Sequence, residues 1–103
     1  MAGLGKFLKQ AQKMQAEMQR VQDQLAQREV EATAGGAVKA VAKCDGSIVS
    51  VKIVDPRVVD PKDVEMLEDL ILAAVTNALQ LAKKTQEEEL GKVTAGMNLP
   101  GLM

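Results

Sequence analysis

The stretch LGKFLKQAQKMQAEMQRVQDQL, residues 4–25, decides the fold of this chain. Its apolar side chains recur with gaps of three and four residues in alternation, which is the pattern of a helix that buries a narrow seam against another helix. The seam residues are Leu4, Phe7, Ala11, Met14, Met18, Val21 and Leu25. Within this stretch no Gly or Pro follows Gly5, and the Gln, Lys, Met and Ala residues favour a helix. The pattern predicts a helix over about residues 3–27 with a coiled-coil seam.

Basic side chains lie on the face of this helix away from the seam. They are Lys6, Lys9, Lys13 and Arg20. At about 1.5 Å of rise per residue they form a stripe roughly 20 Å long. The first thirteen residues contain three lysines and no acid, although the net charge of the chain is −1. This asymmetry indicates an anionic partner. The alternative is an ordinary solvated helix face, on which Glu17 pairs with Lys13 or Arg20 at helical spacing.

After Leu25 the period of the apolar residues changes from helical to alternating. Alternation predicts strands over about residues 29–33, 37–44 and 47–54. Together with the predicted helices, this order indicates an α+β protomer with a three-stranded antiparallel sheet.

The hairpin turns predict a register for each pair of strands. Asp45-Gly46 indicates a two-residue type I′ turn, which would pair Cys44 with Ser47, Ala42 with Val49, Ala40 with Val51 and Val38 with Ile53. In the first hairpin we expect a three-residue loop, 34–36, which pairs Ala32 with Val38 and Glu31 with Lys39. A two-residue loop would turn Glu31 toward the core.

A second long helix is predicted over about residues 61–90. Asp60 is the expected N-cap, Pro61 the first helical residue and Gly91 the residue that ends the helix. Its broad apolar stripe should cover the sheet. The stripe residues are Val64, Leu67, Leu70, Ile71, Ala74, Ala78, Leu81 and Ala82. We expect residues 92–103 to form a flexible tail. No repeat or linker divides the chain, so one domain is expected over residues 1–103.

The composition argues against catalysis. The 103 residues include no histidine, which removes the commonest general base and metal ligand. The single cysteine, Cys44, is expected to be a small buried core residue. The acids of residues 60–69 are expected to cap the second helix and keep it soluble. We therefore expect no catalytic residue, no metal, no cofactor, no small-molecule substrate and no enzymatic activity. The chain shows neither a signal peptide nor an apolar run of about 20 residues, so we expect a cytoplasmic protein that binds no membrane.

The helical seam and the basic stripe indicate binding functions. The positions that flank the seam are mostly Gln, so homodimerisation is expected, whereas a seam that only covers its own sheet is the alternative. Lysines contact phosphate better than they read bases, so the stripe favours double-stranded DNA bound with low sequence preference. The absence of Trp and Tyr, with Phe7 in the seam, argues against binding single strands by stacking.

The chain as a whole resembles the YbaB/EbfC family of bacterial nucleoid-associated proteins. The resemblance lies in GLGKFLKQAQKMQAEMQ at 3–19, EMLEDLILAAVTNA at 65–78 and GMNLPG at 96–101. It implies an α-β-β-β-α protomer, a tweezer-shaped homodimer and DNA binding without a cofactor. It also implies roles in nucleoid organisation and gene regulation.

The resemblance further implies that the helices contact DNA. The candidate residues are Lys6, Lys9, Lys13, Arg20, Lys83 and Lys84, although the acidic run 87–89 weakens the case for the last two. The alternative function is a dimeric protein-interaction module that uses the seam or the C-terminal tail.

Overall fold

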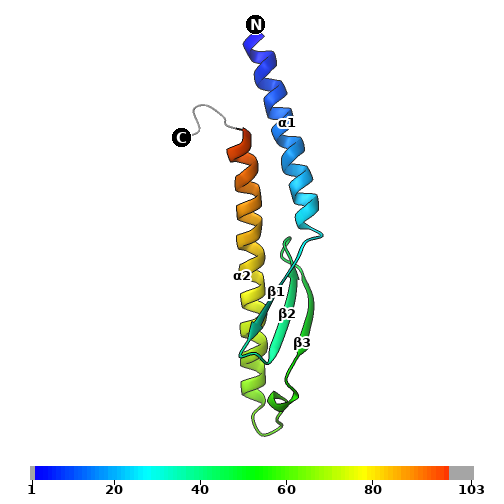
Figure 1. Cartoon of the computed structure of the whole chain (residues 1–103), viewed down its shortest axis with the longest axis vertical. Coiled ribbons are helices and arrows are strands. Elements are labelled where there is room, and N and C mark those ends of the chain that lie inside the picture. Colours follow the sequence, from blue (N-terminus) through cyan, green and yellow to red (C-terminus); the bar gives the residue numbers. More distant parts are fainter. Residues whose placement is uncertain (1, 98–103) are drawn as a thin grey trace.

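The computed structural model describes residues 2–97, and it has the predicted element order (Figure 1). The elements are α1 (Ala2–Leu25), β1 (Glu29–Ala34), β2 (Val38–Lys43), β3 (Ile48–Ile53), the short 3-10 helix η1 (Pro56–Val58) and α2 (Val64–Met97). The strands form one antiparallel sheet in the order β1-β2-β3. The molecule is elongated, with extents of 74 × 24 × 15 Å. The predicted α-β-β-β-α fold is confirmed.

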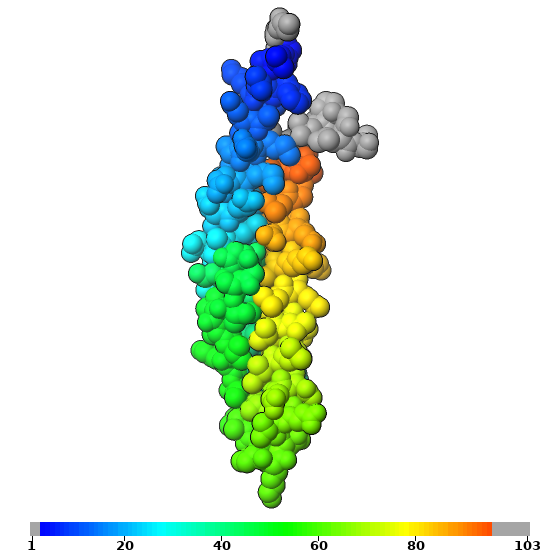
Figure 2. Space-filling view, turned by 180° about the vertical axis from the view of Figure 1, so that it is seen from behind, coloured from blue at the N-terminus to red at the C-terminus, as the bar shows by residue number. Residues whose placement is uncertain are grey.

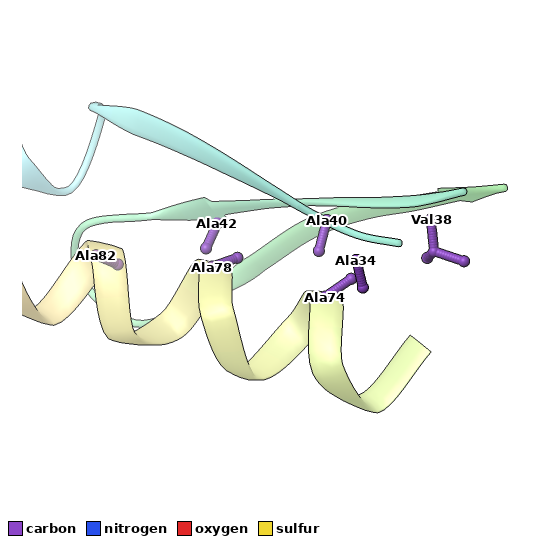
Figure 3. Close-up of a cluster of buried hydrophobic side chains, with 7 residues drawn as sticks. All are labelled: Ala34, Val38, Ala40, Ala42, Ala74, Ala78 and Ala82. Carbon is purple, nitrogen blue, oxygen red and sulfur yellow. The ribbon is translucent and has the colours of Figure 1, made fainter. Parts of the chain in front are cut away.

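The sheet packs on the first part of α2 through alanine side chains. Alanines of β1 and β2 lie against alanines of α2 (Figure 3). The buried cluster consists of Ala34, Val38, Ala40, Ala42, Ala74, Ala78 and Ala82. Because alanine extends only one carbon from the backbone, the helix and the sheet can approach each other closely. Larger aliphatic side chains, including Leu67, Ile71 and Val75, pack around this contact.

A second buried cluster joins the end of α1 to the last turns of α2. It contains Val21, Leu25, Cys44 and Val93. The Cys44 amide donates a hydrogen bond of 2.9 Å to the Arg28 carbonyl, and Arg28 Nη1 lies 3.3 Å from Glu89 Oε1. Cys44 is therefore the buried core residue that the sequence predicts.

The register between β1 and β2 differs from the predicted one. Ala34 pairs with Val38 and Ala32 with Ala40, so the predicted pairing of Ala32 with Val38 is wrong by two residues along β2. The loop has three residues, as predicted, but they are Gly35, Gly36 and Ala37. The shift keeps Ala32 on the face toward α2 and lets Ala34 reach the core as well. Lys39 still lies 3.7 Å from Glu31, now across a diagonal.

The turn between β2 and β3 contains an irregularity that the sequence prediction lacks. From Val38↔Ile53 to Val41↔Ser50 the predicted register is confirmed. Ala42 then pairs with Ile48 instead of Val49, so the two-residue turn is wrong there and Val49 is an extra, bulged residue. The Asp45 carboxylate accepts hydrogen bonds from the amide and the hydroxyl of Ser47, which draws the turn into this wider shape.

Gly35 and Gly36 both adopt left-handed backbone conformations, with φ of +57° and +66°. A Cβ on Gly35 would lie 3.1 Å from Leu70 Cδ2, whereas a Cβ on Gly36 would meet nothing within 4 Å. Both Gly35→Ala and Gly36→Ala should lose about 1–2 kcal/mol through the backbone. Gly35→Ala should lose roughly 0.5–1 kcal/mol more because Leu70 must shift. Urea unfolding of both variants measures the difference, and equal losses would contradict the contact with Leu70.

The predicted start of α2 is wrong by three residues. Asp60 accepts a hydrogen bond from the Lys62 amide, and the Asp63 amide donates to the Asp60 carbonyl, which closes a separate turn. The helix begins at Val64, and the Asp63 carboxylate caps it by accepting from the Met66 amide at 3.2 Å. Asp63, rather than Asp60, is therefore the N-cap.

The predicted end of α2 is also wrong, because the helix continues through Gly91 to Met97. A glycine inside a helix costs about 1 kcal/mol relative to alanine. Val93 is only 8% exposed in the cluster with Val21 and Leu25, and burial of such a side chain contributes about 1.5–3 kcal/mol. The stabilisation from burying Val93 therefore outweighs the tendency of Gly91 to end the helix. Residues 92–97 are therefore helical, and the rest of the predicted flexible tail, 98–103, lies outside the described residues.

The sheet is wider than the surface that α2 covers. Ile48, Val51 and Ile53 face the same side as the buried alanines of β2, yet they are 41%, 40% and 41% exposed. The prediction that α2 covers the apolar face holds for β1 and β2 and is wrong for β3. An apolar strip along an edge strand is left open.

Candidate nucleic-acid interface

The N-terminal part of α1 extends beyond the last described turn of α2 (Figures 1 and 2). We call residues 3–14 of α1 the arm. Lys6, Lys9 and Lys13 are exposed on the arm, and none of them forms an ion pair with another residue of the described range 2–97. The arm contains no acid. It therefore presents three positive charges over about 10 Å, a length of duplex that carries about six phosphate charges.

Arg20, the fourth predicted stripe residue, is held by an acid of its own helix. Its Nη2 lies 2.8 Å from Glu17 Oε2, and its Nε donates to Glu17 Oε1 at 3.2 Å. The hydrogen bond from Arg20 lowers the pKa of Glu17 below its usual value, and the same bond raises the pKa of Arg20. The sequence alternative, in which Glu17 pairs with a basic neighbour, is thus realised at Arg20. The free part of the stripe is the three lysines.

Glu17→Gln should strengthen binding to duplex DNA, because it removes the acid that pairs with Arg20 and so releases the arginine. The gain should be several-fold at low salt and should vanish at high salt. Fluorescence anisotropy with a labelled random duplex measures it. Glu65→Gln, which removes the same charge from the start of α2, is the control. If both variants bind alike, the local charge around Arg20 plays no part.

Lys83 and Lys84 are exposed on α2, on a different helix from the lysine stripe. The acidic run 87–89 follows one turn later. Glu89 pairs with Lys92 at 3.2 Å and with Arg28 at 3.3 Å, and the hydrogen bond from Lys92 is the main cause that lowers the pKa of Glu89. Glu87 and Glu88 take no part in these ion pairs and are exposed near Lys83 and Lys84, so their negative charge opposes DNA binding there.

Negative charge gathers at the other end of the molecule, where α2 begins. Asp63, Glu65 and Asp69 line a shallow pocket of about 350 Å³ together with Met66 and Leu70. The start of α1 and the start of α2 lie at opposite ends of the long axis (Figure 1), so the lysines of the arm form a basic tip and this acidic group forms an acidic base. A polyanion should attract the tip and repel the base, which orients the approach. The sequence showed both charge groups, but only the fold reveals their separation.

The predicted dimer seam is divided between two environments. Val21 and Leu25 are buried against Cys44 and Val93 of the same chain, and Met18 packs beside them. Leu4 and Phe7 are 59% and 65% exposed, and a small apolar groove of about 90 Å³ is lined by Phe7, Gln10, Ala11 and Met14. Only the first half of the seam is open to a partner, and its pairing with a second copy stays a prediction.

The described residues were compared with the side-chain clusters that metal binding and catalysis require. Within residues 2–97, no three His, Cys, Asp or Glu side chains are grouped so that they could hold a metal ion. Burial raises the pKa of the Cys44 thiol. No helix in the described range has the length and apolar character needed to span a membrane.

Comparison with known proteins identifies the family of this chain. The profile of the YbaB/EbfC DNA-binding family matches residues 1–97. The chain belongs to this family. The resemblance noted from the sequence is confirmed, and the family is one of DNA-binding proteins rather than enzymes.

Individual relatives match over nearly the whole chain. A nucleoid-associated protein of Pelotomaculum thermopropionicum is 50% identical over 100 residues, which cover 96% of this chain and 94% of the relative. One of Thermoanaerobacter pseudethanolicus is 51% identical over 100 residues, which cover 96% and 89%. The crystal structure of an uncharacterized protein from Helicobacter pylori superposes with a TM-score of 0.56 at 19% identity, covering 94% of this chain and 95% of that one. That structure shares the fold.

Proposed function

We propose that this protein is a homodimer that binds double-stranded DNA in the bacterial nucleoid, mainly through phosphate contacts and with low sequence preference. The observation that carries the proposal is the stripe of Lys6, Lys9 and Lys13, which form no ion pair within residues 2–97, on an arm without acids. The names of the relatives support the place in the nucleoid. In this role the protein contributes to nucleoid organisation and gene regulation.

The chemistry of the arm supports phosphate contacts over base readout. Lysine is a point charge on a flexible stem, which suits phosphate, whereas bidentate reading of guanine favours arginine. Arg20, the arginine nearest to the stripe, is engaged by Glu17. Binding should therefore depend strongly on salt and weakly on sequence.

The open strip on β3 supports the dimer. Ile48, Val51 and Ile53 lie on an edge strand whose outer backbone groups have no neighbour in the sheet order β1-β2-β3. Such an edge is a template for a further strand, and its apolar side chains gain from being covered. We assign the main contact between two copies to this strip, in a region of the protein remote from the lysine stripe.

The dimer is tested by light scattering on two matched variants. Val51→Asp places a charge on the open strip, whereas Ser50→Asp places it on the opposite face of the same strand. We expect the mass of one chain for Val51→Asp and of two chains for Ser50→Asp. If instead Phe7→Ser separates the copies and Val51→Asp does not, the α1 seam holds the dimer and the assignment to β3 is overturned.

The DNA proposal is tested by the salt dependence of binding to random duplex DNA. For a protein that contacts about six phosphates, log affinity should fall with log salt at a slope of about −5. Competition with single-stranded DNA and with a second duplex of unrelated sequence measures the preference. Absence of binding at low salt, where electrostatic attraction is greatest, would refute the proposal and favour the protein-interaction alternative.

A further inference from the structure

The arm of α1 carries an apolar face that is largely exposed. Leu4, Phe7 and Leu8 are 59%, 65% and 53% exposed, and Ala11 and Met14 continue the same side of the helix, because gaps of three and four residues follow its period. Further along α1 this line of residues becomes the buried part of the seam, which packs near the last turns of α2. The exposed face therefore continues a face that already contacts another helix within the chain.

The charges of the arm leave this face free for a second, equally basic arm. Lys6, Lys9 and Lys13 lie on the opposite side of the helix, and the seam is flanked by the uncharged residues Leu8 and Gln10. In a pair of helices joined through this face, the lysines of the two copies would be roughly 20 Å apart. That distance is about twice the screening length of about 10 Å at 0.1 M salt, so repulsion between the arms would be small.

The sizes of the side chains favour an antiparallel pair of arms. When two arms run in opposite directions, one offset places Phe7 of each copy against Ala11 of the other, and Leu4 of each copy against Met14 of the other. The bulky ring then meets the smallest seam residue, beside the groove of about 90 Å³ that Phe7, Gln10, Ala11 and Met14 line. A parallel pair would place Phe7 against Phe7 and Ala11 against Ala11, so that large side chains collide and small ones leave a gap.

The free length of the arm fits this pair. α2 runs antiparallel to α1, and Val93 lies in the cluster with Val21 (Figure 1). Four residues further, at about 1.5 Å per residue, Met97 should be level with about Glu17. In the antiparallel offset, residue 16 of one arm lies level with residue 2 of the other. The second arm therefore covers the seam as far as the point that the described part of α2 reaches.

We propose that the arms of two copies pair antiparallel through Leu4, Phe7, Ala11 and Met14. Each arm uses the same surface, so the contact closes at two arms. It spans about three turns of helix, which is a small contact, so the pair forms in concentrated protein and dissociates on dilution. In the dimer of the proposed function each copy keeps a free arm, and pairing would link dimers into larger assemblies. That consequence rests on the proposed function, whereas the pairing of two arms does not.

Disulfide trapping in the full chain tests the antiparallel pair, whichever surface holds the dimer. Leu4→Cys/Met14→Cys places the two thiols opposite each other in different copies, whereas within one chain they are about 15 Å apart and cannot join. In concentrated protein with a glutathione redox buffer, we expect about fivefold more disulfide between chains than for Leu4→Cys/Gln12→Cys, whose second thiol lies away from the seam. The parent, in which Cys44 is buried, measures the background.

Two results of the trapping experiment would overturn the proposal. Equal trapping in the two double variants would mean that chance collision joins the thiols. Trapping of Leu4→Cys alone to the same extent as the Leu4→Cys/Met14→Cys variant would mean that the arms lie parallel, because a parallel pair sets residue 4 against residue 4.

The mass of Val51→Asp at rising concentration tests whether the arm itself is the contact. In this variant the β3 contact is disrupted, and the average mass should rise from about one chain at 20 µM toward about 1.7 chains at 1 mM, for a Kd near 0.2 mM. Added Phe7→Ser should abolish the rise, whereas added Gln12→Ser, on the outer side of the arm, is the matched control and should not. Because both arms are positive, salt should leave the pair intact or strengthen it.

Other occupants of the arm give different results. Association that weakens with salt, or that grows beyond two chains, would mean that the basic tip docks on the acidic base of the next copy, and the proposal would be overturned. If Val51→Asp is already two chains in dilute protein, the assignment of the dimer to β3 fails. In that case separation of the chains by Phe7→Ser supports the pair of arms, and a mass of two chains in Val51→Asp/Phe7→Ser overturns it.

Discussion

Replacing Lys6, Lys9 and Lys13 together by glutamine is expected to lower the affinity for random duplex DNA by about a hundredfold or more at low salt. In the part of the chain that the structure describes, the three lysines form no ion pair, and the arm contains no acid. Each phosphate contact that is lost removes about 0.9 from the slope of log affinity against log salt. A dimer with both arms on one duplex would lose six contacts, so the slope should fall by about five.

The control for this variant removes the same charge elsewhere. Lys43→Gln/Lys52→Gln/Lys62→Gln changes the net charge equally but leaves the arm intact, and it should retain most of the affinity. Anisotropy titrations at several salt concentrations compare the two triple variants. Glutamine favours a helix about as well as lysine, so circular dichroism should report an unchanged fold in the arm variant. If the two triple variants bind equally, net charge rather than the stripe governs binding.

The largest expected effect on stability comes from the alanine contact between α2 and the sheet. Ala74→Leu adds three carbons where the helix faces alanines of β1 and β2, at a position with 0% exposure. Overpacking a close contact typically costs 1–3 kcal/mol, and we expect about 3 kcal/mol here because the alanines on both sides let the helix and the sheet lie too close together to admit a leucine without moving apart. For a chain of this size the midpoint of thermal unfolding should fall by roughly 15 °C.

Ala73 supplies a matched control one residue away, because it is exposed on the outer face of α2. Ala73→Leu adds the same carbons and should change the free energy of unfolding by less than about 0.5 kcal/mol. Urea unfolding of both variants at one chain concentration measures the difference. Similar stabilities would mean that the helix and the sheet can separate at little cost, contrary to the packing in Figure 3.

The hairpins show how far local patterns determine a sheet. The period of two correctly placed Val30 and Ala32 toward the core, because alternation decides which face a residue takes. Alternation does not fix the register, because sliding β2 by two residues keeps every side chain on the same face of the sheet. The observed register differs from the predicted one by such a slide. The observed register is favoured over the predicted one because it buries Ala34, and Ala34 is buried only when α2 packs on the sheet.

The candidate site divides in the same way. The residue types and spacing were sufficient to identify the lysine stripe, because side chains on one helix face follow from the helical period alone. The pairing of Arg20 with Glu17 was within reach as one of two options. The opposite charge of the two ends and the open strip on β3 follow only from how α2 lies across the sheet.

The sequence by itself determined the order of elements, the two helix faces of α1 and the apolar face of each strand, since these depend on neighbours within a few residues. Tertiary structure decided where α2 ends, how the strands are offset and which half of the seam is covered. At Gly91 the local preference to stop, about 1 kcal/mol, is smaller than the stabilisation from burying Val93 against α1. Contacts between distant segments outweighed local preference at that residue, and no local pattern contains them.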